Sequence, residues 1–291
     1  MNQELFQIIL KDGRQLAYAE FGKPDGFPVL YFHGSPASRL EPQILGDQAL
    51  GQLRLRIIAP DRPGMGQSDF QPGRGFSHWP ADVLALAGAL GLDRFSVLGN
   101  SGGAGYAAVC AAKIPERLHN VVIVSGGWQM NWPEAMDNVP PPNRLFLKLS
   151  RTAPFLLPVL LKMMAGSPDD KPEQTLAQFK RSMHPADYAV LEQPGRVEHL
   201  MQMTRESMAH GTKGVVWDMR LHVQDWDFLL DEVRMPLKLF HGEEDRNAPI
   251  QMVRKVMTML PTAHLVTYAG EAHLSTPCNH LEEIAQALVR E

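Results

Sequence analysis

The chain has 291 residues, of which 44% are hydrophobic and 21% are charged. These proportions fit a folded globular protein and exclude a disordered one. The length favours two domains, or one large α/β domain with an insertion. The net charge is −4 and no long run of one sign occurs. This argues against a protein that binds nucleic acid or a membrane surface, because such proteins present a basic face.

The two cysteines, Cys110 and Cys278, are too few for a disulfide framework, and neither belongs to a Cys-x-x-Cys pair. The first residues lack the basic and apolar segments of a secretory signal. No run of about 18 apolar residues could span a membrane. We therefore expect a cytoplasmic protein without a membrane partner.

Short apolar runs alternate with helical patterns over the first 130 residues. The predicted strands lie at residues 5–10, 15–21, 29–32, 55–59, 95–98 and 121–124, and the predicted helices at 38–52, 77–90 and 101–113. The pair Asp12-Gly13 marks a hairpin turn between the first two strands. The alternation that follows is typical of βαβ crossovers and a parallel sheet.

The strand pattern stops near Gly126-Gly127 and returns after about one hundred residues rich in proline and methionine. Helices are predicted within that stretch at 145–150, 156–164, 173–183 and 197–210. Beyond it, strands are predicted at 237–240 and 265–268, and helices at 252–260 and 281–289. The sequence thus predicts one α/β domain, residues 1–127 and 228–291, interrupted by a helical insertion at 128–227.

A Gly-x-Ser-x-Gly pattern occupies Gly99 to Gly103, between a predicted strand and a predicted helix. A sharp strand-to-helix turn requires small neighbours, which gives Gly99 and Gly103 a steric reason. Ser101 at the start of the helix would meet the positive end of the helix dipole, which favours a developing anion. Taken alone, the pattern fits a structural Gly-Ser turn equally well.

A serine nucleophile needs a base, and the base must be oriented by a third group. Asp245 and His273 each follow a predicted strand, so both are expected at the carboxyl edge of the sheet, where ligands bind. The chain order Ser101, Asp245, His273 is the order known for such a site. Other loop acids and histidines compete on sequence alone, namely Glu243, Glu244, His264 and His280.

The segment His33-Gly34-Ser35-Pro36 follows the strand predicted at 29–32. A loop in this place supplies one N–H group of an oxyanion hole, and the residue after the nucleophile supplies the other. This indicates the backbone amides of Ser35 and Gly102. His33 has two interpretations, a structural hydrogen-bonding residue or a substrate contact, and an ordinary proline-containing turn remains an alternative for the whole segment.

No cofactor or metal site is expected. The loop from Asp61 to Ser68 contains Gly-x-Gly, but it lacks the third glycine and the Lys-Ser/Thr pair of phosphate-binding loops. We interpret it as a tight structural loop. The histidines are scattered, and no group has the spacing of metal ligands on one helix face.

Four of the five tryptophans and nine of the fifteen methionines lie between residues 128 and 228. Such residues suit an adaptable apolar pocket, although a small helical subdomain also needs them for its core. Trp128 directly follows a predicted sheet strand, so it is the best candidate in the insertion for a substrate contact. We expect an apolar pocket lining with few charged groups, and a neutral, medium-sized, apolar or aromatic acyl substrate.

Together these motifs resemble those of the α/β-hydrolase superfamily. The matching segments are His33 to Pro36, Asp61 to Asp69, Gly99 to Gly103, His241 to Asp245 with Pro249, and His273. The resemblance covers about residues 5–127 and 228–291, and implies a mostly parallel sheet with helices on both faces and a helical cap after the sixth strand. The cap matches only in position, so no substrate carries over.

The resemblance implies Ser101 as nucleophile, His273 as base and Asp245 as the acid that orients it. It implies a serine hydrolase that cleaves an ester or similar acyl bond of a small molecule. A serine in place of an aspartate nucleophile is unlike dehalogenases and epoxide hydrolases. The alternatives left open are a C–C bond hydrolase, lyase or cofactor-free peroxidase on the same triad, and a ligand sensor without activity. The oligomeric state is left open.

Overall fold

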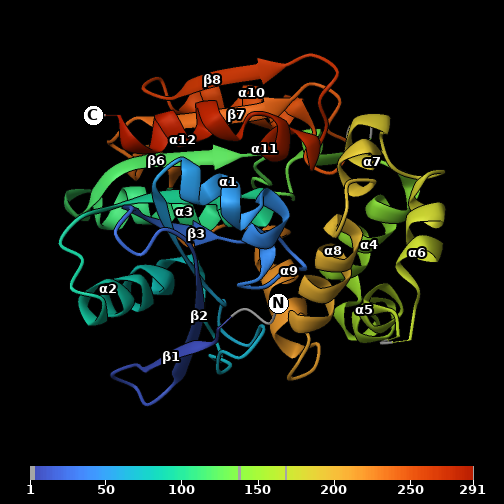
Figure 1. Ribbon diagram of the computed structural model, residues 1–291, viewed down its shortest axis with the longest axis horizontal. Helices are drawn as coiled ribbons and strands as arrows, with labels where there is room; N and C mark the ends of the chain where they lie inside the picture. The colour runs from blue at the N-terminus through green and yellow to red at the C-terminus, as the bar shows by residue number, and fades with distance from the viewer. Residues whose placement is uncertain (1–3, 137–138, 168, 291) are drawn as a thin grey trace.

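An eight-stranded sheet runs through the protein in the order β1-β2-β4-β3-β5-β6-β7-β8 (Figure 1). The computed structural model describes residues 4–136, 139–167 and 169–290. The strands are β1 (Phe6–Ile9), β2 (Gln15–Gly22), β3 (Phe27–Phe32), β4 (Leu55–Pro60), β5 (Phe95–Asn100), β6 (Leu118–Val124), β7 (Leu237–Gly242) and β8 (His264–Tyr268). Strand β2 is antiparallel to both neighbours, and every other pair is parallel. The expected mostly parallel sheet is confirmed.

Helices cover both faces of this sheet. They are α1 (Asp47–Gln52), α2 (Trp79–Ala89), α3 (Ala104–Lys113), α10 (Ile250–Met259), α11 (Ser275–Asn279) and α12 (Leu281–Val289). Residues of α2, α3 and α10 share one hydrophobic cluster, and residues of α1 and α12 share another. In Figure 1, α1 and α12 lie in front of the sheet and α3 behind it.

The alternation of buried side chains along the strands produces these two cores. In β3, Leu30 and Phe32 belong to one cluster, while Val29 and Tyr31 belong to the other. Successive residues of a strand point to opposite faces. A parallel sheet covered on both faces therefore reads as a continuous apolar run, which is what made these strands visible in the sequence.

Six further α-helices occupy the described part of the chain between β6 and β7, where no strand occurs. They are α4 (Pro141–Thr152), α5 (Leu157–Ala165), α6 (Pro172–Phe179), α7 (Pro185–Leu191), α8 (Arg196–Glu206) and α9 (Lys213–His222). Figure 1 shows α4 to α8 beside the end of the sheet toward which the arrows of β6 and β8 point. The insertion thus lies beside the carboxyl edge of the parallel strands.

Several predicted helices differ in the structure. The single helix predicted at 38–52 is a 3₁₀ helix, Glu41–Leu45, followed by α1. Gly46 between them has a φ of 89°, which interrupts helical geometry. Helices α7, α9 and α11 were not predicted. Helices α7 and α11 have only seven and five residues, and α9 buries two polar side chains that break its apolar periodicity.

Candidate active site

A sharp turn presents Ser101 at the end of β5. Ser101–Gly103 form a 3₁₀ turn that leads into α3, and Ser101 has a φ of 50°. A Cβ atom on Gly103 would lie 2.0 Å from the carbonyl oxygen of Phe32, and one on Gly99 would lie 2.8 Å from the carbonyl oxygen of Gly103. Both glycines are therefore required by close packing. The positive φ of Ser101 is a backbone strain of order 1–3 kcal/mol, and strained residues of this type are typical of functional sites.

The loops after β7 and β8 bring an acid and a histidine to this serine. Ser101 Oγ donates a hydrogen bond to His273 Nε2 over 2.9 Å. The opposite ring nitrogen, Nδ1, donates to Asp245 Oδ2 over 2.7 Å. The competing acids, Glu243 and Glu244, are exposed to solvent. The structure thus brings together the three residues that the sequence singled out.

The carboxylate of Asp245 is fixed at both of its oxygens. Its Oδ1 accepts hydrogen bonds from the amides of Asn247 and Ala248, at 2.8 and 2.9 Å. Burial raises the pKa of Asp245, but the charge and hydrogen bond of His273 outweigh it and the pKa is lowered. Asp245 is therefore a charged, immobile acceptor for the imidazole ring.

The pairing with Asp245 also changes the pKa of His273. Burial lowers the pKa of His273, but the charge and hydrogen bond of Asp245 outweigh this effect and raise the pKa to about 9. Asp187 and Glu41 add to the increase through their negative charges. An unperturbed histidine titrates near ~6.5. His273 is thus a stronger base than its residue type alone indicates.

The backbone of Gly34 and Ser35 lies close to Ser101 and Gly102. A Cβ atom on Gly102 would lie 3.4 Å from the amide nitrogen of Ser35, so the two backbones approach closely. The neighbouring Gly34 amide is occupied, since it donates to Glu41 Oε2 over 2.8 Å. Within the described ranges, the Ser35 amide is bonded to no protein acceptor. Ser35 and Gly102 thus lie close together beside Ser101.

A buried charge cluster supports the loop that carries Ser35. Asp218 of α9 accepts a hydrogen bond from Ser35 Oγ at 2.8 Å. It also pairs with Arg62, whose Nε and Nη2 lie 3.0 and 2.8 Å from the two carboxylate oxygens. Arg62 donates in addition to the carbonyl oxygens of His33 and Gly34. These contacts of Arg62 and Asp218 were not predicted from the sequence.

The insertion also contacts the other parts of the site. His222 of α9 donates from Nε2 to the carbonyl oxygen of Gly102 over 2.8 Å. Asp187 of α7 accepts from the amides of Leu274 and Ser275, each at 2.8 Å. Those amides directly follow His273. The helical insertion is thus bonded both to Gly102 and to the loop that carries His273.

Comparison with known proteins agrees with this geometry. The family model described as "alpha/beta hydrolase fold" matches residues 28–276. The chain belongs to this family. The resemblance noted from the motifs is therefore confirmed.

Similar proteins of this α/β-hydrolase family carry several names. The chain is 27% identical over 266 residues to a 2-hydroxymuconate semialdehyde hydrolase of Pseudomonas putida, which covers 90% of this chain and 84% of that protein. It is 25% identical to the bifunctional esterase/perhydrolase DCH of Acinetobacter calcoaceticus, covering 97% of both. Among solved structures, a bromoperoxidase from Bacillus anthracis has a TM-score of 0.67 at 19% identity, covering 99% and 98% of the two chains. These relatives share the fold and differ in the activity that they are named for.

Two residues expected at the substrate surface are buried in this α/β hydrolase. Trp128 has no exposed surface and stacks on Trp226, with the ring centroids 6.2 Å apart, in the core. His33 is equally buried: its Nδ1 lies 2.8 Å from the Gly34 carbonyl oxygen and its Nε2 accepts from the Arg62 amide. Burial and the Arg62 charge hold the pKa of His33 well below its usual value. Of its two interpretations, the geometry supports the structural one.

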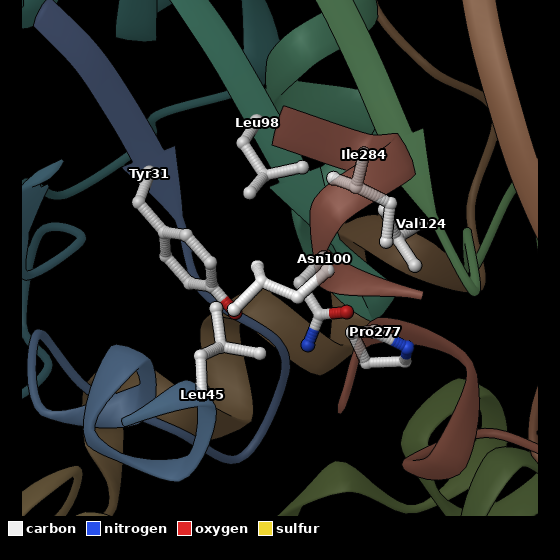
Figure 2. Close-up of a pocket in the computed structure, with 8 residues that line it drawn as sticks. Tyr31, Leu45, Leu98, Asn100, Val124, Pro277 and Ile284 are labelled. Carbon is white, nitrogen blue, oxygen red and sulfur yellow. The ribbon is translucent and has the colours of Figure 1, made fainter. Parts of the chain in front are cut away.

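A small cavity lies beneath the turn that carries Ser101. Figure 2 shows Asn100, the residue before the serine, together with Tyr31, Val124 and Pro277 around it. Its volume is about 10 Å³, roughly what a single water molecule needs. This cavity therefore cannot hold an acyl substrate.

A larger groove, of about 750 Å³, lies between α4 and the segment that follows β6. Its apolar lining includes Met130, Trp132 and Leu147. Three cationic side chains of α4 also line it, namely Arg144, Lys148 and Arg151. The insertion was expected to offer few charged groups, so this positive wall was not anticipated from the sequence.

The part of the chain that the structure describes contains neither a cluster of metal ligands nor a membrane-spanning helix. No group of three or more His, Cys, Asp or Glu side chains there is arranged to hold a metal ion. No helix there has both the length and the apolar content needed to cross a bilayer.

Proposed function

We propose that this α/β hydrolase is a serine hydrolase that cleaves a carboxylic ester or a similar acyl bond of a small molecule. The observation that carries the proposal is the continuous hydrogen-bond chain from Ser101 through His273 to Asp245, with spacings of 2.9 and 2.7 Å. The three side chains have the roles of nucleophile, base and orienting acid. Residues 128–227 are the helical cap of this enzyme.

The reaction follows from these positions. His273 Nε2 accepts the proton of Ser101 Oγ as the oxygen attacks the substrate carbonyl carbon. The amides of Ser35 and Gly102 stabilise the resulting oxyanion. The tetrahedral intermediate then collapses, and the protonated His273 gives its proton to the departing alcohol. Water attacks the acyl-enzyme with His273 again as the base, which releases the carboxylic acid and restores Ser101.

Hydrolysis of a panel of nitrophenyl esters tests this proposal. The wild-type protein should hydrolyse at least one member, and the Ser101→Ala variant should lose that activity while retaining its melting temperature. Equal hydrolysis by the two proteins would show that Ser101 is not the nucleophile. A folded wild-type protein that hydrolyses no ester would count against an esterase.

Other chemistry on the same triad is the second candidate. The names of the relatives favour it, because one is a 2-hydroxymuconate semialdehyde hydrolase and another an esterase/perhydrolase. Assays with a β-diketone, and with an ester in the presence of hydrogen peroxide, separate these activities from simple ester hydrolysis. Turnover of either substrate at a higher kcat/KM than any ester would favour this candidate. The intact triad counts against a third possibility, a ligand sensor without activity.

A further inference from the structure

We propose that helix α9 of the insertion is a positioning element of the oxyanion hole, acting through Asp218 and His222. The inference rests on the proposed serine hydrolase function and adds two positioning residues to it. Asp218 and His222 are one helical turn apart and therefore lie on the same face of α9. Asp218 bonds to the Ser35 hydroxyl and His222 to the Gly102 carbonyl, each at 2.8 Å. Each side chain thus holds one of the two residues whose amides form the hole.

The Asp218 carboxylate is held rigidly because both of its oxygens accept hydrogen bonds. It is fully buried, and it accepts hydrogen bonds from Arg62, Arg74, Tyr106 and Ser35. A buried charge is tolerated only with such partners. Burial raises its pKa, but the charge of Arg62, with further contributions from His222 and Arg74, outweighs burial and holds the pKa well below the usual value.

Arg62 extends this rigidity to the loop before Ser35. Its guanidinium bonds to both oxygens of Asp218 and also to the carbonyl oxygens of His33 and Gly34. The loop is therefore held to α9 both through its backbone and through the Ser35 side chain. Glu41 holds the Gly34 amide independently of the insertion.

Catalysis depends on the exact direction of the two amides. Oxyanion donors are effective when they lie 2.7–3.1 Å from the developing negative charge, and a shift of about 1 Å in a reacting group can cost a hundredfold in rate. Loss of the α9 bonds would leave both amides present but free to turn. The hole is then complete only while α9 is docked, so the insertion contributes to the rate and not only to substrate binding.

The test compares Asp218→Asn, Ser35→Ala and the double variant. Each single variant should lower kcat about tenfold to a hundredfold with little change in KM, because the transition state loses more than the bound substrate. The kcat of the double variant should fall no further than that of the more affected single variant. The reason is that Asp218→Asn and Ser35→Ala both remove the same hydrogen bond, the one between Ser35 and Asp218. Losses that multiply in the double variant would overturn the proposal.

Asp82→Asn is the matched control. Asp82 of α2 is also buried and accepts two hydrogen bonds from Arg14, at 2.9 and 2.7 Å, and within the described residues its side chain is bonded to no residue of the proposed site. This control should lower the melting temperature as Asp218→Asn does, yet leave kcat unchanged. If the control lowers kcat as much as Asp218→Asn, the role of Asp218 is only structural and the proposal fails.

His222 is tested by His222→Gln and His222→Ala. Glutamine retains an N–H donor for the Gly102 carbonyl oxygen, so it should restore part of the kcat that alanine removes. Equal kcat values for the two variants would contradict a positioning role.

Hydrogen exchange gives a readout that needs no turnover. The hydrogen-bonded amides of Arg62 and Met130, which donate to His33 Nε2 and to the His222 carbonyl oxygen, should exchange faster in Asp218→Asn than in the wild type and in Asp82→Asn. Unchanged exchange would overturn the α9 inference even in an active enzyme. An inactive wild type with the expected exchange pattern would instead refute the proposed function and leave the α9 contacts supported.

Discussion

Asp245 accepts one short hydrogen bond from His273. The nearby Glu244 provides a control for the role of Asp245. Asp245→Asn should lower kcat by up to about 10⁴, because the amide favours the wrong tautomer of the imidazole ring. Glu244→Gln changes an exposed acid one residue earlier and should have no such effect. Steady-state kinetics on the best ester measures both. The reverse result would assign the role to Glu244.

The pH dependence of turnover follows from His273. The ring must be neutral to accept the serine proton, and its pKa is raised to about 9. The protonated fraction therefore falls only as the pH rises through that value, and kcat/KM should keep increasing well above neutrality. A profile on a neutral ester from about pH 6 to 10 measures this. A plateau reached by about pH 7 would fit the unperturbed histidine expected from residue type and contradict the raised pKa.

Trp128 is packed in the core, so its removal should affect stability. Trp128→Ala should lower the free energy of unfolding by about 3–5 kcal/mol, the range for large buried aromatic residues. Trp132→Ala, at the partly exposed groove, should cost less. Urea unfolding compares the two variants. An unchanged unfolding midpoint for Trp128→Ala, with a raised KM for bulky esters only, would restore the substrate contact that the sequence suggested.

At the scale of elements, α7 holds the loop that carries His273. Asp187 accepts hydrogen bonds from the two amides that follow the histidine. Asp187→Ala should therefore free the loop and lower kcat. Asp187→Asn keeps one acceptor oxygen and should lower kcat less. Asp169→Ala, an exposed acid of the same insertion, is the control. The kcat and the melting temperature of the three variants test whether α7 positions His273. Equal kcat in all three would show that α7 does not position His273.

The sheet elements could be predicted because their local pattern is strong. All eight strands coincide with short apolar runs bounded by turn residues, such as the run from Phe27 to Phe32. Helix α9 could not be predicted in this way, because Asp218 and His222 interrupt its apolar face. Those same interruptions are the signal that the face meets a buried polar site.

The residues of the candidate site also fall into those that could be predicted from the sequence and those that could not. Ser101, Asp245 and His273 could be predicted because each follows a strand in a characteristic order. Arg62 and Asp218 could not, since no motif marks either residue and only the tertiary fold brings them together. The burial of Trp128 could not be predicted, because its position after β6 does not determine the direction in which its ring packs.

For the whole molecule, buried neutral histidines make stability depend on pH. Burial lowers the pKa of His33 and His241 below the usual 6.5. The unfolded chain therefore binds more protons than the folded one at acid pH, and this contribution to stability is present above about pH 6.5 and is lost as the pH falls. The raised pKa of His273 has the opposite sign, since its contribution is present below about pH 6.5 and is lost as the pH rises through about 9. The melting temperature should therefore drop between about pH 6.5 and 5.

His241→Asn tests the source of this dependence. Asparagine can still donate to the carbonyl oxygen of Ala248, which His241 Nε2 contacts at 2.8 Å, but it does not titrate. Its melting temperature should change less between the two pH values than that of the wild type. An equal change in both proteins would place the dependence elsewhere.

The central claim is that His273 and Asp245 activate Ser101 as a nucleophile, and covalent labelling tests it most directly. The folded wild-type protein is incubated with a fluorophosphonate at a pH where a large fraction of His273 is neutral, and the modified peptide is identified by mass spectrometry. The account predicts one label per chain, on Ser101, with labelling abolished in Ser101→Ala and strongly slowed in Asp245→Asn. A folded wild-type protein that takes up no label, or takes it up at another residue, would contradict the account.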